Sequence, residues 1–232
     1  MEKIYCTREI ARLILLQRIE LASPFLKKIR KLMGRYFFSN FAPKYFIKPN
    51  EITIKYIELM KKELDSLQDF INFSNKKLLS IGSGMGGLEL AISRKYYNTS
   101  FDIIEKNYVS KKVKYGWDQK NDEAYNNLIL LNSFLENNGV KKNLLNFYNY
   151  DSDNLPINEF DIIVSLYSLD YHYDFDFYQD YLKKVANKNT SIVFDTIRPD
   201  YFKDIFRNIK IIQSDQKTVH KSKRIICNEF II

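Results

Sequence analysis

The chain has 232 residues, 45% of them hydrophobic, and a formal net charge of +8. This length allows one large domain, or a domain with an extension, and a sizeable core. No run approaches the roughly 18 apolar residues of a membrane span. Cys6 and Cys227 have neither metal-ligand spacing nor the density of a disulfide framework. We therefore expect a cytoplasmic protein without a signal peptide, a membrane span or a bound metal.

The excess of positive charge lies in the first part of the chain. Residues 1–62 contain 14 Lys and Arg against 5 Glu, a balance of +9, whereas the remaining 22 basic and 23 acidic residues give −1. A basic surface of this kind suits nucleic acid, a phosphorylated or nucleotide-linked sugar, or a membrane surface. No block of five like charges occurs, however, and this favours ordinary solvated helix faces.

The first 75 residues read as a helical extension or lid. Apolar residues at helical spacing predict helix over 2–33, with Pro24 starting a second helix that Ser23 caps. Residues 37–50 are aromatic and irregular, with proline breakers, and helical spacing returns over 51–72. No linker separates this extension from residues 76–232.

Beyond residue 75, short strands alternate with helices. Strands are predicted at 77–81, 100–104, 144–148, 160–166, 191–195, 209–213 and 223–230. Helices are predicted at 86–97, 107–138, 175–186 and 199–207. Strand–helix alternation implies a parallel sheet, and the last two strands, joined by a turn-rich stretch, imply a hairpin. We therefore predict an α/β fold, a Rossmann-like seven-stranded, mostly parallel sheet with an antiparallel C-terminal edge strand.

A glycine loop follows the first strand and opens into a helix. Its residues Gly82, Ser83, Gly84 and Gly86 match both dinucleotide-binding and S-adenosylmethionine (SAM) binding patterns. A dehydrogenase would need a further substrate domain, but one sheet uses the remaining residues.

On the loop and this order of elements, residues 76–232 resemble the class I SAM-dependent methyltransferases. The resemblance implies that the glycine loop wraps the methionine part and the ribose of SAM. Glu105, at the end of the second strand, would accept hydrogen bonds from the ribose hydroxyls, unless it is a solvated strand end.

The resemblance also assigns residues after the third and fourth strands. Asp151 would accept from the adenine amino group and Ser152 would offer its backbone N–H, with Asp153 as a competitor and a plain turn as the alternative. Ser165, ending the fourth strand, is also placed at the cofactor.

One position departs from the family pattern. An acidic residue usually stands two places before the first glycine, where this chain has Ser80. Anchoring of the methionine end then falls to a neighbouring group, for which the segment 45–48 is a candidate.

The loop after the fourth strand carries the candidate chemistry. His172 is one of two histidines, and a histidine suits removal of a proton from a hydroxyl. Asp170 would orient it or bind substrate, whereas the alternative is that His172 is a packed or surface residue. His220 reads as part of a solvated turn.

Two absent motifs and one insertion restrict the chemical class of the methyl acceptor. No Asn/Asp-Pro-Pro-Tyr motif follows the fourth strand, and no cysteine lies near it. The insertion over 108–139 includes Trp117, which would stack on a sugar or pack at a helix junction. Together with residues 169–173 and the helical N-terminal extension, this insertion bears a weaker resemblance to proposed bacterial sugar O-methyltransferases of surface-polysaccharide synthesis.

We therefore predict methyl transfer from SAM to a hydroxyl of a carbohydrate or phosphorylated metabolite. One alternative is an RNA methyltransferase that docks through its basic N-terminal region. The other is a methyltransferase-like scaffold that binds a partner without catalysis.

Overall fold

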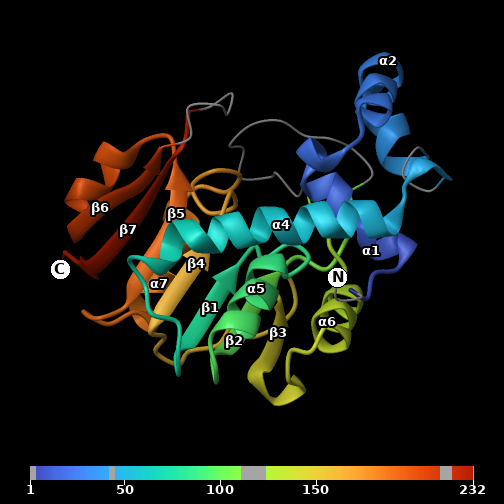
Figure 1. Ribbon diagram of the computed structural model, residues 1–232. Coiled ribbons are helices and arrows are strands. Elements are labelled where there is room, and N and C mark those ends of the chain that lie inside the picture. Colours follow the sequence, from blue (N-terminus) through green and yellow to red (C-terminus); the bar gives the residue numbers. More distant parts are fainter. Residues whose placement is uncertain (1–3, 42–44, 111–123, 215–220, 232) are drawn as a thin grey trace.

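The computed structural model describes residues 4–41, 45–110, 124–214 and 221–231 (Figure 1). A seven-stranded sheet runs through its centre in the order β3-β2-β1-β4-β5-β7-β6. The strands are β1 (Lys77–Ile81), β2 (Ser100–Glu105), β3 (Leu145–Asn149), β4 (Ile162–Ser165), β5 (Ser191–Thr196), β6 (Phe206–Ser214) and β7 (Lys223–Phe230). Strands β1 to β5 are parallel, and β7 is antiparallel to both of its neighbours.

The mixed, mostly parallel sheet confirms the predicted fold class, with one difference at the C-terminal end. Strand β7 is antiparallel as expected, but it is inserted between β5 and β6, so that β6 forms the edge. Burial explains the order. Residues 224–227 of β7 are all buried, as an interior strand requires, whereas most of β6 is exposed or half-buried.

Helices cover both faces of the sheet. They are α1 (Arg8–Gln17), α2 (Pro24–Asn40), α4 (Pro49–Gln68), α5 (Gly87–Lys95), α6 (Leu128–Asn137) and α7 (Asp176–Val185), with short 3-10 turns η1 (Ile19–Leu21), η2 (Lys142–Leu144) and η3 (Pro199–Asp204). Neighbouring residues Leu78 and Leu79 enter different cores, as the twofold period of a strand dictates. Helices α1, α4, α5 and α6 pack in one core, and α7 in the other.

The N-terminal region shares the first core with the sheet. Pro24 begins α2 as predicted, and the Leu26 N–H donates to the Ser23 hydroxyl at 3.3 Å. The single helix predicted before it is interrupted, because α1 ends at Gln17 and η1 follows. Helix α2 reaches past its predicted end at residue 33, but it is kinked at Gly34, whose φ of 79° is not helical. Among the described residues, no helix has the length and apolarity required to cross a bilayer.

The mostly helical stretch predicted over about 107–138 is described at residues 107–110 and 124–138. Only Leu128–Asn137 is helical in the described residues of that stretch, because the Asn127 side chain caps the helix there, accepting from the Leu130 N–H at 3.0 Å. Before it, Val109 and Tyr125 form an antiparallel bridge. Trp117, for which the sequence left sugar stacking and packing at a helix junction open, lies outside the described residues.

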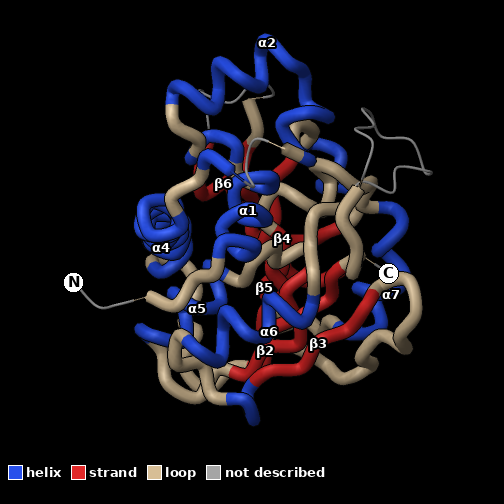
Figure 2. The backbone as a smooth tube through the Cα atoms, turned by 90° about the vertical axis from the view of Figure 1, so that its right-hand side faces the viewer, coloured by secondary structure: helices blue, strands red, loops and turns tan. Residues whose placement is uncertain are grey.

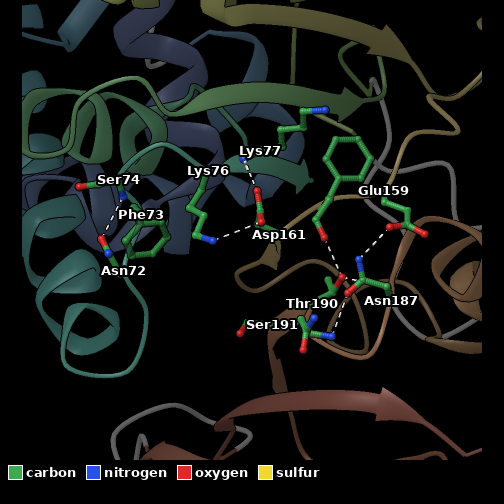
Figure 3. A network of polar contacts seen from close by, with 12 residues as sticks. Asn72, Phe73, Ser74, Lys76, Lys77, Glu159, Asp161, Asn187, Thr190 and Ser191 are labelled. Carbon is green, nitrogen blue, oxygen red and sulfur yellow. Dashed lines mark hydrogen bonds and ion pairs between the residues drawn. The ribbon is translucent and has the colours of Figure 1, made fainter.

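Polar contacts tie the amino-terminal edge of the sheet together (Figure 3). The Asp161 carboxylate, just before β4, accepts from the Lys77 backbone N–H at 2.8 Å and from the Lys76 ammonium at 3.2 Å. The Thr190 hydroxyl, just before β5, donates to the Phe160 carbonyl at 2.7 Å. These contacts fix the starts of three parallel strands and leave the opposite, carboxyl edge for ligands.

Candidate functional site

The glycine loop at the carboxyl end of β1 uses glycine for conformational and steric reasons. Gly82, Gly84 and Gly86 have φ values of 72°, 61° and 71°, which side-chain-bearing residues rarely adopt. A Cβ on Gly82 would also lie 2.2 Å from the Ser168 hydroxyl oxygen. The loop therefore comes against the segment that follows β4, and α5 begins directly after it.

Glu105 meets the glycine loop, as the sequence predicts. Its carboxylate accepts from the Gly84 backbone N–H at 2.5 Å. Burial raises the pKa of Glu105 to about 7, although hydrogen bonds from Gly84 and Asn126 act in the opposite direction. The Asn126 amide also donates to the Gly84 carbonyl at 2.7 Å. A carboxylate is thus held beside the loop at the end of β2.

Two segments that the sequence did not assign to the site also contact the loop. Gln17, the last residue of α1, donates through its amide to the Tyr125 carbonyl at 2.6 Å. Its side-chain oxygen lies 2.7 Å from the position that a Cβ on Gly84 would take. The end of α1 and residues 124–126 therefore lie against the glycine loop. The signal available in the sequence was the polar Gln17 closing an apolar helical run.

Ser80 is paired with a buried glutamate from α5. The Ser80 hydroxyl donates to Glu89 at 2.5 Å, and Glu89 is 1% exposed. Its second carboxylate oxygen has no hydrogen-bond partner among the described residues. Burial raises the pKa of Glu89 to about 7, with the Ser80 hydrogen bond acting against this rise.

A buried carboxylate, nine residues later in the chain, thus lies beside Ser80. In the segment 45–48, the candidate from the sequence, Tyr45 and Phe46 are exposed and Lys48 pairs with Glu51. An acidic residue in the first turn after the glycine loop was the overlooked signal.

The two aspartates in the turn after β3 have different contacts. The Asp153 carboxylate accepts from the Asn149 backbone N–H at 2.8 Å and so closes its own turn. The Asp151 carboxylate is half-exposed and lies 3.2 Å from the Lys106 ammonium, next to the end of β2. The Ser152 hydroxyl bonds to Asp153 and accepts from Asn149. Both oxygens of Asp153 thus accept hydrogen bonds from its own turn, whereas Asp151 contacts the residue that follows β2.

Ser165 and Asp170 have structural partners in the loop after β4. The Ser165 hydroxyl donates to the Ile81 carbonyl at 2.7 Å and accepts from the Leu169 N–H at 2.9 Å. The Asp170 carboxylate is fully buried and accepts from Thr196 and from Arg198, the latter at 2.6 Å. Burial raises the pKa of Asp170, and its bonds to Arg198 and Thr196 oppose the rise. Both side chains hold the loop to the strands beside it.

His172 lies on the exposed side of the same loop. Its backbone N–H donates to the Ser168 carbonyl at 2.8 Å, and its ring packs edge-on to Tyr171 with 5.1 Å between centroids. The Ser168 side chain is the group that approaches Gly82. The loop that carries His172 therefore begins beside the glycine loop, while the Asp170 carboxylate is committed to Arg198 and Thr196.

A buried ionic cluster contacts the loop after β4 at Tyr167. Arg224, 1% exposed, binds Asp195 at 3.0 Å and Glu63 of α4 at 2.6 Å. Asp195 also accepts from the Tyr167 backbone N–H at 3.1 Å. The Arg18 guanidinium lies 4.8 Å from the centroid of the Tyr167 ring. The N-terminal helices and the C-terminal strand thus fix one loop together.

Comparison with known proteins concerns the fold. No family model matches the chain, and no curated protein sequence is similar to it. Among solved structures, a proposed O-methyltransferase from Nostoc punctiforme has a TM-score of 0.49 and 10% identity, over 78% of this chain and 58% of that one. TrmN from Thermus thermophilus has a TM-score of 0.49 and 14% identity, over 81% and 55%.

A methyltransferase from Pyrococcus furiosus has a TM-score of 0.47 and 12% identity, over 74% of this chain and 83% of that one. The matched parts therefore span little more than half of the first and second of these three proteins. The strand order, the reversed β7 and the glycine loop after β1 give this chain the fold of the class I methyltransferases.

Proposed function

We propose that the chain transfers a methyl group from SAM to a hydroxyl of a small substrate, a sugar or a phosphorylated or nucleotide-linked metabolite. One observation carries this proposal: the Gly84 N–H holds the Glu105 carboxylate beside the glycine loop at the carboxyl edge of the sheet. In an open α/β sheet, ligands bind outside this edge. A carboxylate there suits the two hydroxyls of a ribose.

The residues present fit SAM. The glycine loop packs closely against its neighbours, since a Cβ on Gly82 or Gly84 would lie less than 3 Å from the side chain of Ser168 or Gln17, and glycine lets a ligand approach the loop backbone. Glu105 suits the ribose, Asp151 suits the adenine amino group, and the Ser152 backbone N–H suits the ring. When bound, SAM supplies an electrophilic methyl group; the protein positions the acceptor and removes its proton.

Glu89 is the group best placed to receive the positively charged amino end of SAM. It occupies the space of the missing acidic residue beside Ser80, and one of its oxygens has no partner among the described residues. A buried carboxylate without a partner is costly. Such a cost is expected where a bound ligand later provides the missing charge.

We expect Glu89→Gln to make the ligand-free protein more stable and to lower its affinity for the ligand. The pKa of Glu89 is raised to about 7 in the folded protein, because the folded protein favours the protonated carboxyl group. The stability that this protonated group contributes is fully present below the unfolded pKa and is lost as the pH rises through 7. At pH 8 the amide should therefore add about 2–3 kcal/mol to the free energy of unfolding, and little at pH 4.5. Urea unfolding at both pH values measures this difference.

The ligand half of this prediction uses a matched pair. Affinity for S-adenosylhomocysteine should fall at least about tenfold in Glu89→Gln, because a charged hydrogen bond is lost. Affinity for methylthioadenosine, which lacks the amino acid part, should be unchanged. The exposed Glu58→Gln is the control for both measurements. Equal losses for the two ligands would refute the assignment of Glu89 to the amino end.

His172 remains our candidate for the base. It stands on the loop that begins beside the glycine loop, and its side chain is exposed to an incoming substrate. Asp170 acts as a positioning residue, holding the loop through Arg198 and Thr196. Arg18, over the Tyr167 ring, places positive charge at the same loop and supports a phosphorylated acceptor.

Methyl-labelled SAM, offered with nucleotide-linked sugars, phosphorylated metabolites and bulk RNA, tests the function. We expect label in a small hydroxyl compound, and a loss of turnover of about 100-fold or more in His172→Ala with unchanged cofactor affinity. His220→Ala removes the other histidine as a control. Full turnover in His172→Ala would refute only the assignment of His172 as the base. Label in RNA would favour the RNA alternative, and a folded protein without detectable SAM affinity would favour a non-catalytic scaffold.

A further inference from the structure

Helix α2 presents an apolar face to solvent. Phe25, Leu32 and Met33 are 59%, 73% and 54% exposed. Together with half-buried Ile29 they fall at the spacing i, i+4, i+7, i+8, which is one side of a helix. Leu26, 2% exposed, anchors the helix to the protein. Figures 1 and 2 both show α2 standing at the end of the molecule, away from the sheet.

The apolar face continues into the segment after α2. The Phe46 ring lies 5.9 Å from that of Phe25, centroid to centroid, and is 51% exposed. Tyr45, beside it, is 62% exposed. We call Phe25, Ile29, Leu32, Met33, Tyr45 and Phe46 the apolar patch. Exposed apolar groups gathered in this way mark an interaction surface.

The other side of α2 is basic. Lys27, Lys28 and Lys31 are exposed. At about 100° per residue Lys27 and Lys31 point away from the apolar side, and Lys28 borders it. Residues 21–50 contain seven Lys and Arg and no Asp or Glu. A helix with aromatic and aliphatic residues on one side and lysines on the other is typical of segments that lie in a membrane interface.

We propose that α2 and the apolar patch dock the protein on an anionic membrane surface. The charge complements acidic lipid headgroups, and Leu32 and Met33 would enter the acyl boundary. RNA would use the lysines but would leave the aliphatic Leu32 and Met33 in water. A second copy of the chain would bring two strongly basic segments together. The inference is independent of the methyl-transfer function.

Co-sedimentation of the full chain with vesicles tests this surface. Vesicles of phosphatidylcholine with 30% phosphatidylglycerol should bind the protein, and pure phosphatidylcholine much less. Lys27→Gln with Lys31→Gln should lower the partition coefficient about fivefold for each lysine. Leu32→Ser with Met33→Ser should lower it at least about tenfold. These side chains are exposed, so the fold should persist, which circular dichroism checks.

Matched variants lie elsewhere on the surface. Lys141→Gln with Lys142→Gln removes two exposed lysines, and Ile157→Ser removes an isoleucine that is 82% exposed; both should bind vesicles like the wild type. No binding to the anionic vesicles, or binding that survives Leu32→Ser with Met33→Ser, would overturn the proposal. So would RNA binding that needs only the lysines, or a dimer in sedimentation velocity that the apolar variant dissolves.

Discussion

Arg224→Met is expected to lower the free energy of unfolding by about 3–5 kcal/mol, because it leaves two buried carboxylates without their cation. Arg224, Asp195 and Glu63 are 1%, 2% and 7% exposed. Burial by itself would lower the pKa of the Arg224 guanidinium, but the two carboxylates more than offset this and raise it above its ordinary value. Arg224 therefore stays charged, and its removal exposes the full cost of the carboxylates.

Urea unfolding of a small series measures this effect. The triple variant Arg224→Met, Asp195→Asn, Glu63→Gln should recover much of the lost stability, since no buried charge is left unpaired. Arg207→Met is the matched control, because that arginine is exposed and pairs with Glu229 at the surface. A loss below about 1 kcal/mol in Arg224→Met, or no recovery in the triple variant, would show that the cluster does not bear on stability.

The sequence was sufficient for the sheet and for the strand ends at its carboxyl edge. Strand patterns and the glycine loop are local signals, and they placed Gly82, Glu105 and Asp151 at the correct strand ends. The position of β7 could not be predicted in this way. In a hairpin of β6 and β7, the two strands pair antiparallel whether β7 is the edge strand or lies one place inside the edge. The burial of its residues 224–227 decides this, and burial belongs to the assembled sheet.

The parts of the site that were missed depend on distant contacts. Glu63 and Arg224 are 161 residues apart, and Gln17 and Tyr125 are 108 apart. No spacing in the sequence pairs them. Asp170 illustrates the opposite case: its position beside His172 suggested a catalytic pair, but its carboxylate turns to Arg198 instead. Chain proximity in a loop does not fix the direction of a side chain.

Glu105→Gln is expected to weaken binding of S-adenosylhomocysteine by about 2–4 kcal/mol, or roughly 30- to 1,000-fold. The amide keeps one acceptor oxygen but loses the charged hydrogen bonds to the ribose hydroxyls. The wild-type affinity should also depend on pH. The pKa of Glu105 is raised to about 7, and the ribose hydroxyls donate to the ionised form, so affinity should rise through pH 7 and level off above it.

Isothermal titration between pH 6 and pH 8.5 measures both effects. The Gln variant should lack the Glu105-dependent rise in affinity. Glu159→Gln, which neutralises a carboxylate at the opposite edge of the sheet, should behave like the wild type. An unchanged affinity in Glu105→Gln would remove Glu105 from the cofactor site.

We expect SAM to bind at the carboxyl edge beside Gly84 and Glu105. Titration of the wild-type chain at pH 8 with S-adenosylhomocysteine, and separately with NADH, tests this. We expect one S-adenosylhomocysteine site per chain, which is lost or strongly weakened in Glu105→Gln, and no binding of NADH. Binding of NADH at this site, or no binding of S-adenosylhomocysteine by the folded wild-type protein, would contradict it.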